Sequence, residues 1–250
     1  MIELQTYVIN LDRSKDRLDA ITHQLDGLGL PFMRIPAVDG KQASPEQKAC
    51  IDEHTYQRKH GKPSLPGELG CYLSHVKAIQ TFLYSDAPFA LILEDDAIFG
   101  EGFVDAVHEL MRHPQKWDMV KLSGVHSGTP VAVLTLNSKY DLAVMFSKCT
   151  CSSAYLINRK AAQAYSEKLL PMTLPYDHEF DLGWKYQIQV RAVSPFPVIH
   201  NEAVATTIVG GSVPNLKFRG CKRWPTHLYR LRTEFSRFTY AVFNYLRSRL

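Results

Sequence analysis

Several features of membrane-spanning and exported proteins are missing from this 250-residue sequence. It has no run of about eighteen apolar residues, so we expect no transmembrane helix. Its N-terminus lacks the basic segment, apolar stretch and small-residue cleavage site of a signal peptide. It has no internal repeat and no low-complexity segment. We therefore expect a globular chain whose first residues enter the fold directly as a strand.

Cysteine is scarce and irregularly spaced. The five cysteines are an odd number and match no zinc-binding pattern. Cys149 and Cys151 are separated by one residue, which is not the spacing of a CxxC motif. A reducing environment is the simplest interpretation, so we expect a cytoplasmic protein.

Acidic residues are almost absent from the C-terminal part of the chain. From Lys217 onward, nine lysines and arginines accompany a single acid, Glu234, whereas residues 1–216 hold 20 basic and 24 acidic residues. We therefore expect a main domain over residues 1–216 and a separate basic helical region over residues 217–250. Apolar residues in this region recur at steps of three and four, which predicts an amphipathic helix: Leu228, Leu231, Phe235, Phe238, Val242 and Tyr245.

This basic helix has three interpretations. It is compatible with peripheral contact with an anionic membrane surface, with packing on its own domain, and with pairing to a second subunit. A nucleic-acid partner is not expected, because the body of the chain is slightly acidic and no nucleic-acid recognition module is visible.

The order of the predicted elements indicates the fold class. Short apolar strands over residues 5–11 and 32–38 flank a helix with apolar residues at helical spacing. A further helix begins near Glu68, and a strongly apolar strand over residues 89–99 follows. A helix over residues 102–112, a strand over 117–122, several short strands over 131–157 and a helix over 159–169 come next. This alternation predicts an α/β fold with a mostly parallel sheet flanked by helices.

Three consecutive acids, Glu94, Asp95 and Asp96, follow the most apolar part of that strand. Strand alternation would point Glu94 and Asp96 to one side and Asp95 to the other. Adjacent carboxylates repel one another and are costly to desolvate, and no basic residue lies between positions 78 and 111. A Mn²⁺ or Mg²⁺ ion would offset both costs, because these cations prefer oxygen ligands. The alternative is a solvated acidic turn.

Other polar positions have a functional and a structural interpretation. Asn10, Asp12, Arg13 and Arg17 follow the first strand, where they suit either a nucleotide or a capped helix with surface arginines. The pair Asp39-Gly40 is either a second nucleotide contact or a plain turn. Ser-His at 74–75 lacks a nearby acid, which argues against a serine hydrolase.

Six segments resemble glycosyltransferase family 25, the lipooligosaccharide and lipopolysaccharide glycosyltransferases. They occur in the family's order over most of residues 1–200 and are VINLDRSKDR (8–17), RIPAVDGK (34–41), GELGCYLSH (67–75), LILEDD (91–96), SSAYLINRKAA (152–162) and PYDHEFD (175–181). The resemblance implies a GT-A-like fold with a Rossmann-type nucleotide half. It also implies inverting transfer of a sugar, often galactose from UDP-galactose, to the core of a bacterial lipooligosaccharide or lipopolysaccharide. From about residue 201 onward, no segment resembles the family.

The resemblance also implies roles for individual residues. Asp177 would be the catalytic base, and Mn²⁺ or Mg²⁺ would be held by Glu94 and Asp96. His200 would be a third ligand, because GT-A enzymes often take a histidine from late in the chain; the alternative is an ordinary strand-end histidine. The donor would contact Asn10, Asp12, Arg13, Arg17, Asp39, Gly40, Ser74, His75, Lys77 and Asp95. The acceptor and sugar pocket would include Ser152, Ser153, Tyr155 and Glu179.

Two other functions remain open at this point. A nucleotidyltransferase or metal-dependent phosphohydrolase also places acids at strand ends, although the sequence has neither a P-loop nor a further acid cluster. A non-catalytic module that binds glycans or membranes through its basic tail is the third hypothesis.

Overall fold

The computed structural model describes residues 3–125, 128–200 and 216–249, and for His200 and Arg249 it describes the backbone alone. The strands are β1 (Leu4–Asn10), β2 (Phe32–Pro36), β3 (Phe89–Glu94), β4 (Ala97–Phe99), β5 (Met119–Lys121), β6 (Pro130–Thr135), β7 (Asp141–Met145), β8 (Ala154–Asn158), β9 (Val190–Ser194) and β10 (Val198–His200).

Nine α-helices lie in the described ranges. They are α1 (Lys15–Gly27), α2 (Pro45–Lys48), α3 (Glu53–His60), α4 (Pro66–Leu83), α5 (Phe103–Arg112), α6 (Arg159–Lys168), α7 (Tyr176–Glu179), α8 (Gly183–Tyr186) and α9 (Trp224–Arg249). Short 3₁₀ helices are η1 (Gly40–Gln42), η2 (Pro114–Lys116) and η3 (Gly220–Arg223).

The main sheet has eight strands in the order β2-β1-β3-β8-β5-β9-β7-β6. The predicted βαβ opening is confirmed, since β1 pairs in parallel with both β2 and β3. The sheet as a whole is mixed, because β8 runs antiparallel to β3 and β5, and β7 runs antiparallel to β6 and β9. The α/β class is thus confirmed, with less parallel pairing than expected. Strand β8 is buried on both faces, so its continuous apolar sequence did not reveal its direction.

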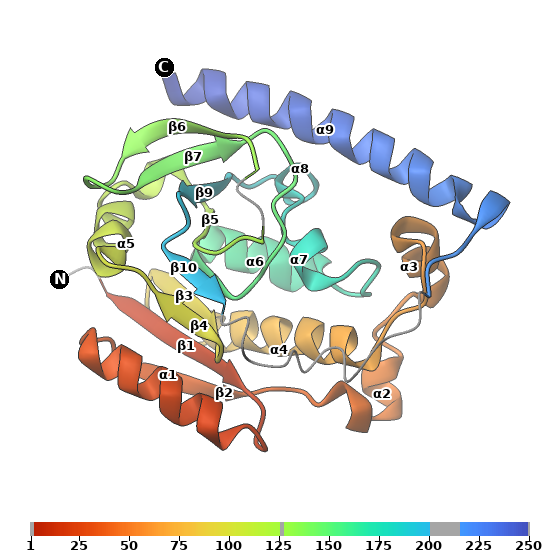
Figure 1. Cartoon of the computed structure of the whole chain (residues 1–250), viewed down its shortest axis with the longest axis horizontal. Coiled ribbons are helices and arrows are strands. Elements are labelled where there is room, and N and C mark those ends of the chain that lie inside the picture. The colour runs from red at the N-terminus through yellow and green to blue at the C-terminus, as the bar shows by residue number, and fades with distance from the viewer. Residues whose placement is uncertain (1–2, 126–127, 201–215, 250) are drawn as a thin grey trace.

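Helices cover both faces of the sheet (Figure 1). Alternate residues of β1 and β3 enter two separate cores: Tyr7 and Ile92 pack on the side of α4 and α6, whereas Val8 and Leu91 pack on the side of α1 and α5. Glu94 continues the alternation of Ile92, so its side chain leaves the sheet on the α4 side.

Helix α9 crosses the outside of the body from α3 to the edge formed by β6 and β7 (Figure 1). It confirms the predicted C-terminal helix and packs on its own domain. Among the described residues, no helix combines the length and apolar character needed to cross a membrane.

Two glycines bring the segment after β2 against the first turn of α4. A Cβ atom on Gly40 would lie 1.6 Å from the carbonyl oxygen of Pro66, and one on Gly70 would lie 2.5 Å from the carbonyl oxygen of Val38. Neither contact is sterically possible. The close approach therefore requires glycine at both positions.

We expect Gly40→Ala to destabilise the protein by about 2 kcal/mol or more, because backbone would have to move to admit the methyl group. Gly27→Ala is the matched control, since a Cβ at Gly27, at the end of α1, meets no atom within 4 Å. That variant should unfold at the same denaturant concentration as the wild type or slightly higher. Urea unfolding measures both, and equal midpoints for Gly40→Ala and wild type would contradict the packing argument.

Candidate functional site

A cavity of about 320 Å³ opens at the edge of the sheet where β1, β2 and β3 end. Ligands bind at this position in open α/β sheets, because the carboxyl ends of parallel strands and the first turns of helices meet there. The antiparallel direction of β8 brings the residues before it, Cys151–Ser153, to the same edge. The first turns of α4 and α7 complete the walls.

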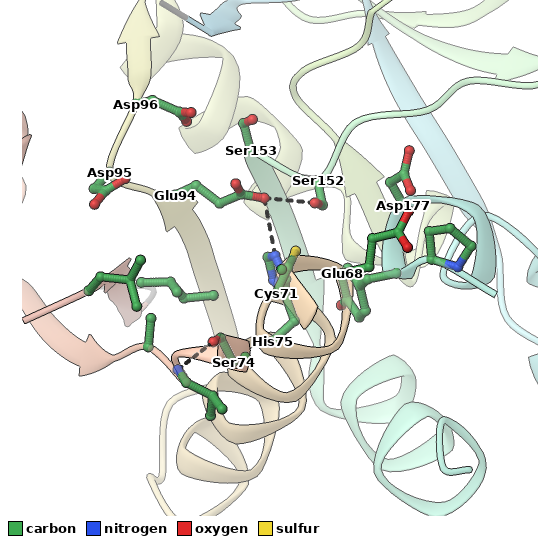
Figure 2. A pocket seen from close by; sticks show the side chains of 18 of the residues that line it. Glu68, Cys71, Ser74, His75, Glu94, Asp95, Asp96, Ser152, Ser153 and Asp177 are labelled. Carbon is green, nitrogen blue, oxygen red and sulfur yellow. Dashed lines mark hydrogen bonds and ion pairs between the residues drawn. The ribbon is translucent and has the colours of Figure 1, made fainter. Parts of the chain in front are cut away.

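Glu94, the last residue of β3, lies at the centre of the cavity wall (Figure 2). Its Oε1 accepts a hydrogen bond from the hydroxyl of Ser152 at 2.7 Å and lies 3.2 Å from Nε2 of His75. Its backbone N–H donates to the carbonyl of Ser153 at 2.8 Å. Burial opposes ionisation of Glu94, but the interactions with His75 and Ser152 outweigh it and hold the pKa of this carboxyl below its ordinary value.

His75 is buried, and aromatic groups fix its ring. The imidazole stacks on Tyr176, with ring centroids 4.1 Å apart, and its Nδ1 lies 3.1 Å from the hydroxyl of Tyr155. That hydroxyl in turn lies 2.9 Å from the hydroxyl of Tyr176. His75 is therefore held on two sides, because one ring edge is anchored in the core while the other faces Glu94.

Asp95 and Asp96 lie in the turn between β3 and β4 and do not extend the strand. Arg17, from α1, forms ion pairs with both carboxylates, and the amide of Asn10 donates to Asp95 Oδ2 at 2.6 Å. The expectation that Asp95 and Asp96 point to opposite sides is wrong, because alternation ends where the chain turns. No lysine or arginine lies near these acids in the sequence, but the fold brings Arg17, 78 positions before Asp95, into contact with them.

Burial dominates the titration of these two acids. It raises the pKa of Asp95, with Arg17 and Asn10 acting in the opposite direction. It raises the pKa of Asp96 to about 6, and the neighbouring charge of Glu94 adds to that increase. Oδ1 of Asp96 is buried with no hydrogen-bond partner among the described residues. A divalent cation fits this environment, because it would neutralise the desolvated carboxylates and use the unpaired oxygen.

Glu94 has a second set of neighbours with metal-ligating atoms. The Sγ of Cys71, a ring nitrogen of His75 and a carboxylate oxygen of Glu94 all lie within 4.8 Å of one another. Such nitrogen and sulfur ligands suit a softer metal than Mn²⁺. Burial, however, raises the pKa of the Cys71 thiol well above its ordinary value, so the thiolate form that binds metals is disfavoured. The oxygen set of Glu94 and Asp96 is therefore the better match for a cation.

The role expected of His200 depends on its side chain, which lies outside the described residues. Its backbone belongs to β10 and pairs with Ala97, the residue that follows Asp96.

Asp177, the second residue of α7, lines the cavity together with Glu94 (Figure 2). Burial raises the pKa of its carboxyl, while the charges of Lys121 and Lys148 act in the opposite direction. A carboxylate whose pKa is raised toward neutrality is a better general base than an ordinary surface aspartate.

The structure divides the ten expected donor residues into two groups. Seven line the cavity: Arg13, Arg17, Asp39, Gly40, Ser74, His75 and Asp95. Arg13 forms an ion pair with Asp39, and the hydroxyl of Ser74 accepts from the backbone of Val38 at 2.8 Å. Three others lie outside the cavity wall: Asn10 is buried behind Asp95, the exposed Asp12 pairs with Arg34, and Lys77 donates to the carbonyl of Pro36.

Two of the four residues expected in the acceptor and sugar pocket are in the cavity wall. Ser152 and Ser153 line it, whereas Tyr155 is buried behind His75. The carboxylate of Glu179 is also buried, and it accepts hydrogen bonds from Lys185 and from the hydroxyl of Tyr186. Tyr155 and Glu179 thus occupy supporting positions, because α7 turns Glu179 away from the cavity while Asp177 faces it.

Sequence reasoning missed several lining residues, notably Lys41, Glu68, Cys71 and Cys151. A usable signal existed for two of them. Positions 68, 71 and 75 follow steps of three and four along α4, so Glu68 and Cys71 share a helix face with His75. No local signal marked Cys151, which adopts a left-handed backbone conformation with φ of 108° before β8.

Comparisons with known proteins identify a matching family. The family described as glycosyltransferase family 25 (LPS biosynthesis protein) matches residues 3–180. A glycosyltransferase 25 family member of Aedes aegypti is 31% identical over 121 residues, which cover 46% of this chain and 20% of the relative. Procollagen galactosyltransferase 1 of Danio rerio is 29% identical over 124 residues, covering 46% and 20%, and procollagen galactosyltransferase 2 of Homo sapiens is 29% identical over 111 residues, covering 43% and 18%. The matched segment spans about a fifth of each relative's length.

The raised pKa of Asp96 predicts a pH dependence of stability. The folded protein holds this proton up to pH about 6, whereas an ordinary aspartate releases it near 3.8. The free energy of unfolding should therefore fall by up to about 3 kcal/mol as pH rises from 4 to 7 without divalent cation. Asp96→Asn should remove the part of this decline that Asp96 causes and be more stable than wild type at pH 7. Urea unfolding at both pH values tests it, with Asp19→Asn on the exposed face of α1 as control; equal pH profiles for Asp96→Asn and wild type would contradict it.

Proposed function

The chain belongs to glycosyltransferase family 25, and on this premise we propose that it transfers a hexose, galactose from UDP-galactose, to a lipooligosaccharide or lipopolysaccharide core with inversion at the anomeric carbon. The observation that carries the proposal is the cavity where Glu94, Asp95 and Asp96 meet Arg13 and Arg17. The donor sugar is supported by the names of the galactosyltransferase relatives, and the acceptor by the family's description.

The arginines are the natural partners of the donor's diphosphate. Guanidinium groups bind phosphate oxygens in a bidentate manner, and both Arg13 and Arg17 line the cavity. Each is already paired with a carboxylate, Arg13 with Asp39 and Arg17 with Asp95 and Asp96. These pairings hold the guanidinium groups in place before the donor arrives, which lowers the entropic cost of binding it.

Glu94 and Asp96, with His200 as a further candidate, would hold Mn²⁺ or Mg²⁺. When bound, the cation would neutralise negative charge on the diphosphate and so stabilise the departing nucleotide. The side chains around it have supporting roles. His75 and Ser152 fix the carboxylate of Glu94, and Asn10 fixes that of Asp95.

Asp177 would act as the base. Its carboxylate takes the proton of the acceptor hydroxyl as that oxygen attacks the anomeric carbon from the face opposite the diphosphate. The new glycosidic bond forms while the bond from the anomeric carbon to the phosphate oxygen breaks, and UDP leaves with the electron pair. No separate acid is needed, because the leaving group departs as a stabilised diphosphate. Ser152 and Ser153, which line the cavity near Glu94, would contact the transferred sugar.

Donor binding should depend on metal. We expect UDP-galactose to raise the melting temperature of the wild type in the presence of Mn²⁺ and to have little effect with chelator, because a bound cation would neutralise charge on the donor's diphosphate. A panel of UDP- and GDP-sugars with and without Mn²⁺ identifies the donor. Asp96→Ala should lose the metal-dependent shift. A shift of equal size in wild type and variant would remove Asp96 from the site.

The base should affect transfer and not donor binding. We expect Asp177→Asn to lower transfer to a lipooligosaccharide acceptor by roughly 10²- to 10⁴-fold while retaining the Mn²⁺-dependent shift with donor, because the variant loses only a proton acceptor. Asp86→Asn is a matched control outside the cavity. Product analysis with labelled UDP-galactose shows whether the label reaches the glycan. Release of nucleotide and phosphate without a glycosylated product would instead favour a phosphohydrolase, and unchanged transfer would exclude Asp177 as the base.

A further inference from the structure

Helix α9 packs on the body of the protein through its polar side. The hydroxyl of Thr226 donates to the carbonyl of Arg58, and Arg237 forms a buried ion pair with Asp181. Near the C-terminal end, Asn244 accepts a hydrogen bond from Arg191 at 3.1 Å. These contacts, spread over five turns, fix the rotation of the helix about its axis.

On the same inward side, between Arg237 and Asn244, the hydroxyl of Tyr240 accepts from the backbone of Val190 at 2.9 Å and donates to the carbonyl of Ile188 at 2.6 Å. Rotating the helix to bury its other side would break all of these bonds and remove the partners that α9 supplies to the buried Asp181 and Arg191.

The apolar side of α9 therefore faces outward. Seven large apolar residues, which we call the outer stripe, are each between 56% and 72% exposed: Trp224, Leu228, Leu231, Phe235, Phe238, Phe243 and Leu246. Most follow one another at steps of three and four, the spacing of a single helix face. An amphipathic helix ordinarily buries this face, and a contiguous exposed apolar surface of this kind marks a docking site.

Charge decides between the partners that could cover the outer stripe. The segment from residue 217 to 250 carries nine basic residues and one acid, and six of the basic side chains that the structure describes are exposed: Lys217, Arg219, Lys222, Arg230, Arg232 and Arg247. Pairing two copies of this helix would bring two strongly positive surfaces together, which is unfavourable. An anionic surface instead complements the charge while the apolar residues leave water.

We propose that α9 lies flat on an anionic lipid bilayer, with the outer stripe inserted at the boundary between headgroups and acyl chains. At about 1.5 Å per residue, its 26 residues give a contact roughly 39 Å long. Trp224 and the phenylalanines suit the interfacial region, and the exposed Arg232, which flanks the stripe on the helix, would contact lipid phosphates. The inference is independent of the transfer chemistry, because it depends only on how α9 is seated.

The test is vesicle co-sedimentation of the whole chain. We expect binding to vesicles of phosphatidylglycerol and phosphatidylcholine, and weak binding to phosphatidylcholine alone. Phe235→Glu should weaken binding about tenfold or more, because an aromatic side chain that would enter the bilayer is replaced by a charge that anionic lipid repels. Tyr84→Glu is the matched control, since Tyr84 is 92% exposed at the end of α4, away from α9. It adds the same charge and should bind like the wild type.

A second variant tests the electrostatic part. Arg232→Gln should weaken binding to the anionic vesicles about fivefold, and wild-type binding should fall as salt is raised. Unchanged thermal unfolding of each variant shows that the fold is intact. Equal vesicle binding by Phe235→Glu and Tyr84→Glu would overturn the proposal. An absence of vesicle binding by the wild type would also overturn it. If sedimentation velocity then shows a dimer that Phe235→Glu dissociates, the outer stripe is instead covered by a second copy of the chain.

Discussion

The site depends on one constraint: three carboxylates occupy the edge of a sheet that is buried on both faces. Each carboxylate has lost much of its water, and each raises the energy of the others. The fold meets this constraint with separate partners, His75 and Ser152 for Glu94, and Arg17 for Asp95 and Asp96. The compensation is incomplete at Asp96, whose pKa stays high and whose Oδ1 has no partner among the described residues. An acid left in this condition is suited to a ligand that brings positive charge.

The rest of the architecture serves to bring those partners to the same edge. The parallel strands β1 and β3 place Asn10 beside Asp95, and the antiparallel β8 brings Ser152 to Glu94 from the opposite chain direction. The close approach of Gly40 and Gly70 seats the start of α4 against the segment after β2, so that Cys71 and His75 face the cavity. A rigid site therefore results from packing around it, since most of these side chains have one end anchored in a core.

Helix α9 differs from the other helices in which of its faces is buried. Its polar residues satisfy buried groups of the body, above all Asp181 and Arg191, whereas the large apolar residues of the outer stripe are exposed. The spacing of apolar residues along the sequence indicates that the helix has an apolar face, but it does not indicate the direction in which that face points. The pattern favoured packing on the domain itself and left contact with a membrane or a second subunit open. The hydrogen bonds along the inward side show that self-packing is real and that it uses the other face.

Local patterns in the sequence were sufficient for the α/β class, the βαβ opening, the long helices α4 and α9, and the acids that end β3. These features depend on periodicity and on turn residues, which short-range physics controls. Three things depended on tertiary structure: the antiparallel direction of β8, the pairing of Arg17 with Asp95 and Asp96, and the separation of Asp177, in the cavity, from Glu179, behind it. Each depends on contacts between residues far apart in the chain or on where a short helix is seated, and no local pattern encodes either. The chemistry at the edge of the sheet was thus visible in the residue types, whereas the partners that tune it became visible only when the chain was folded.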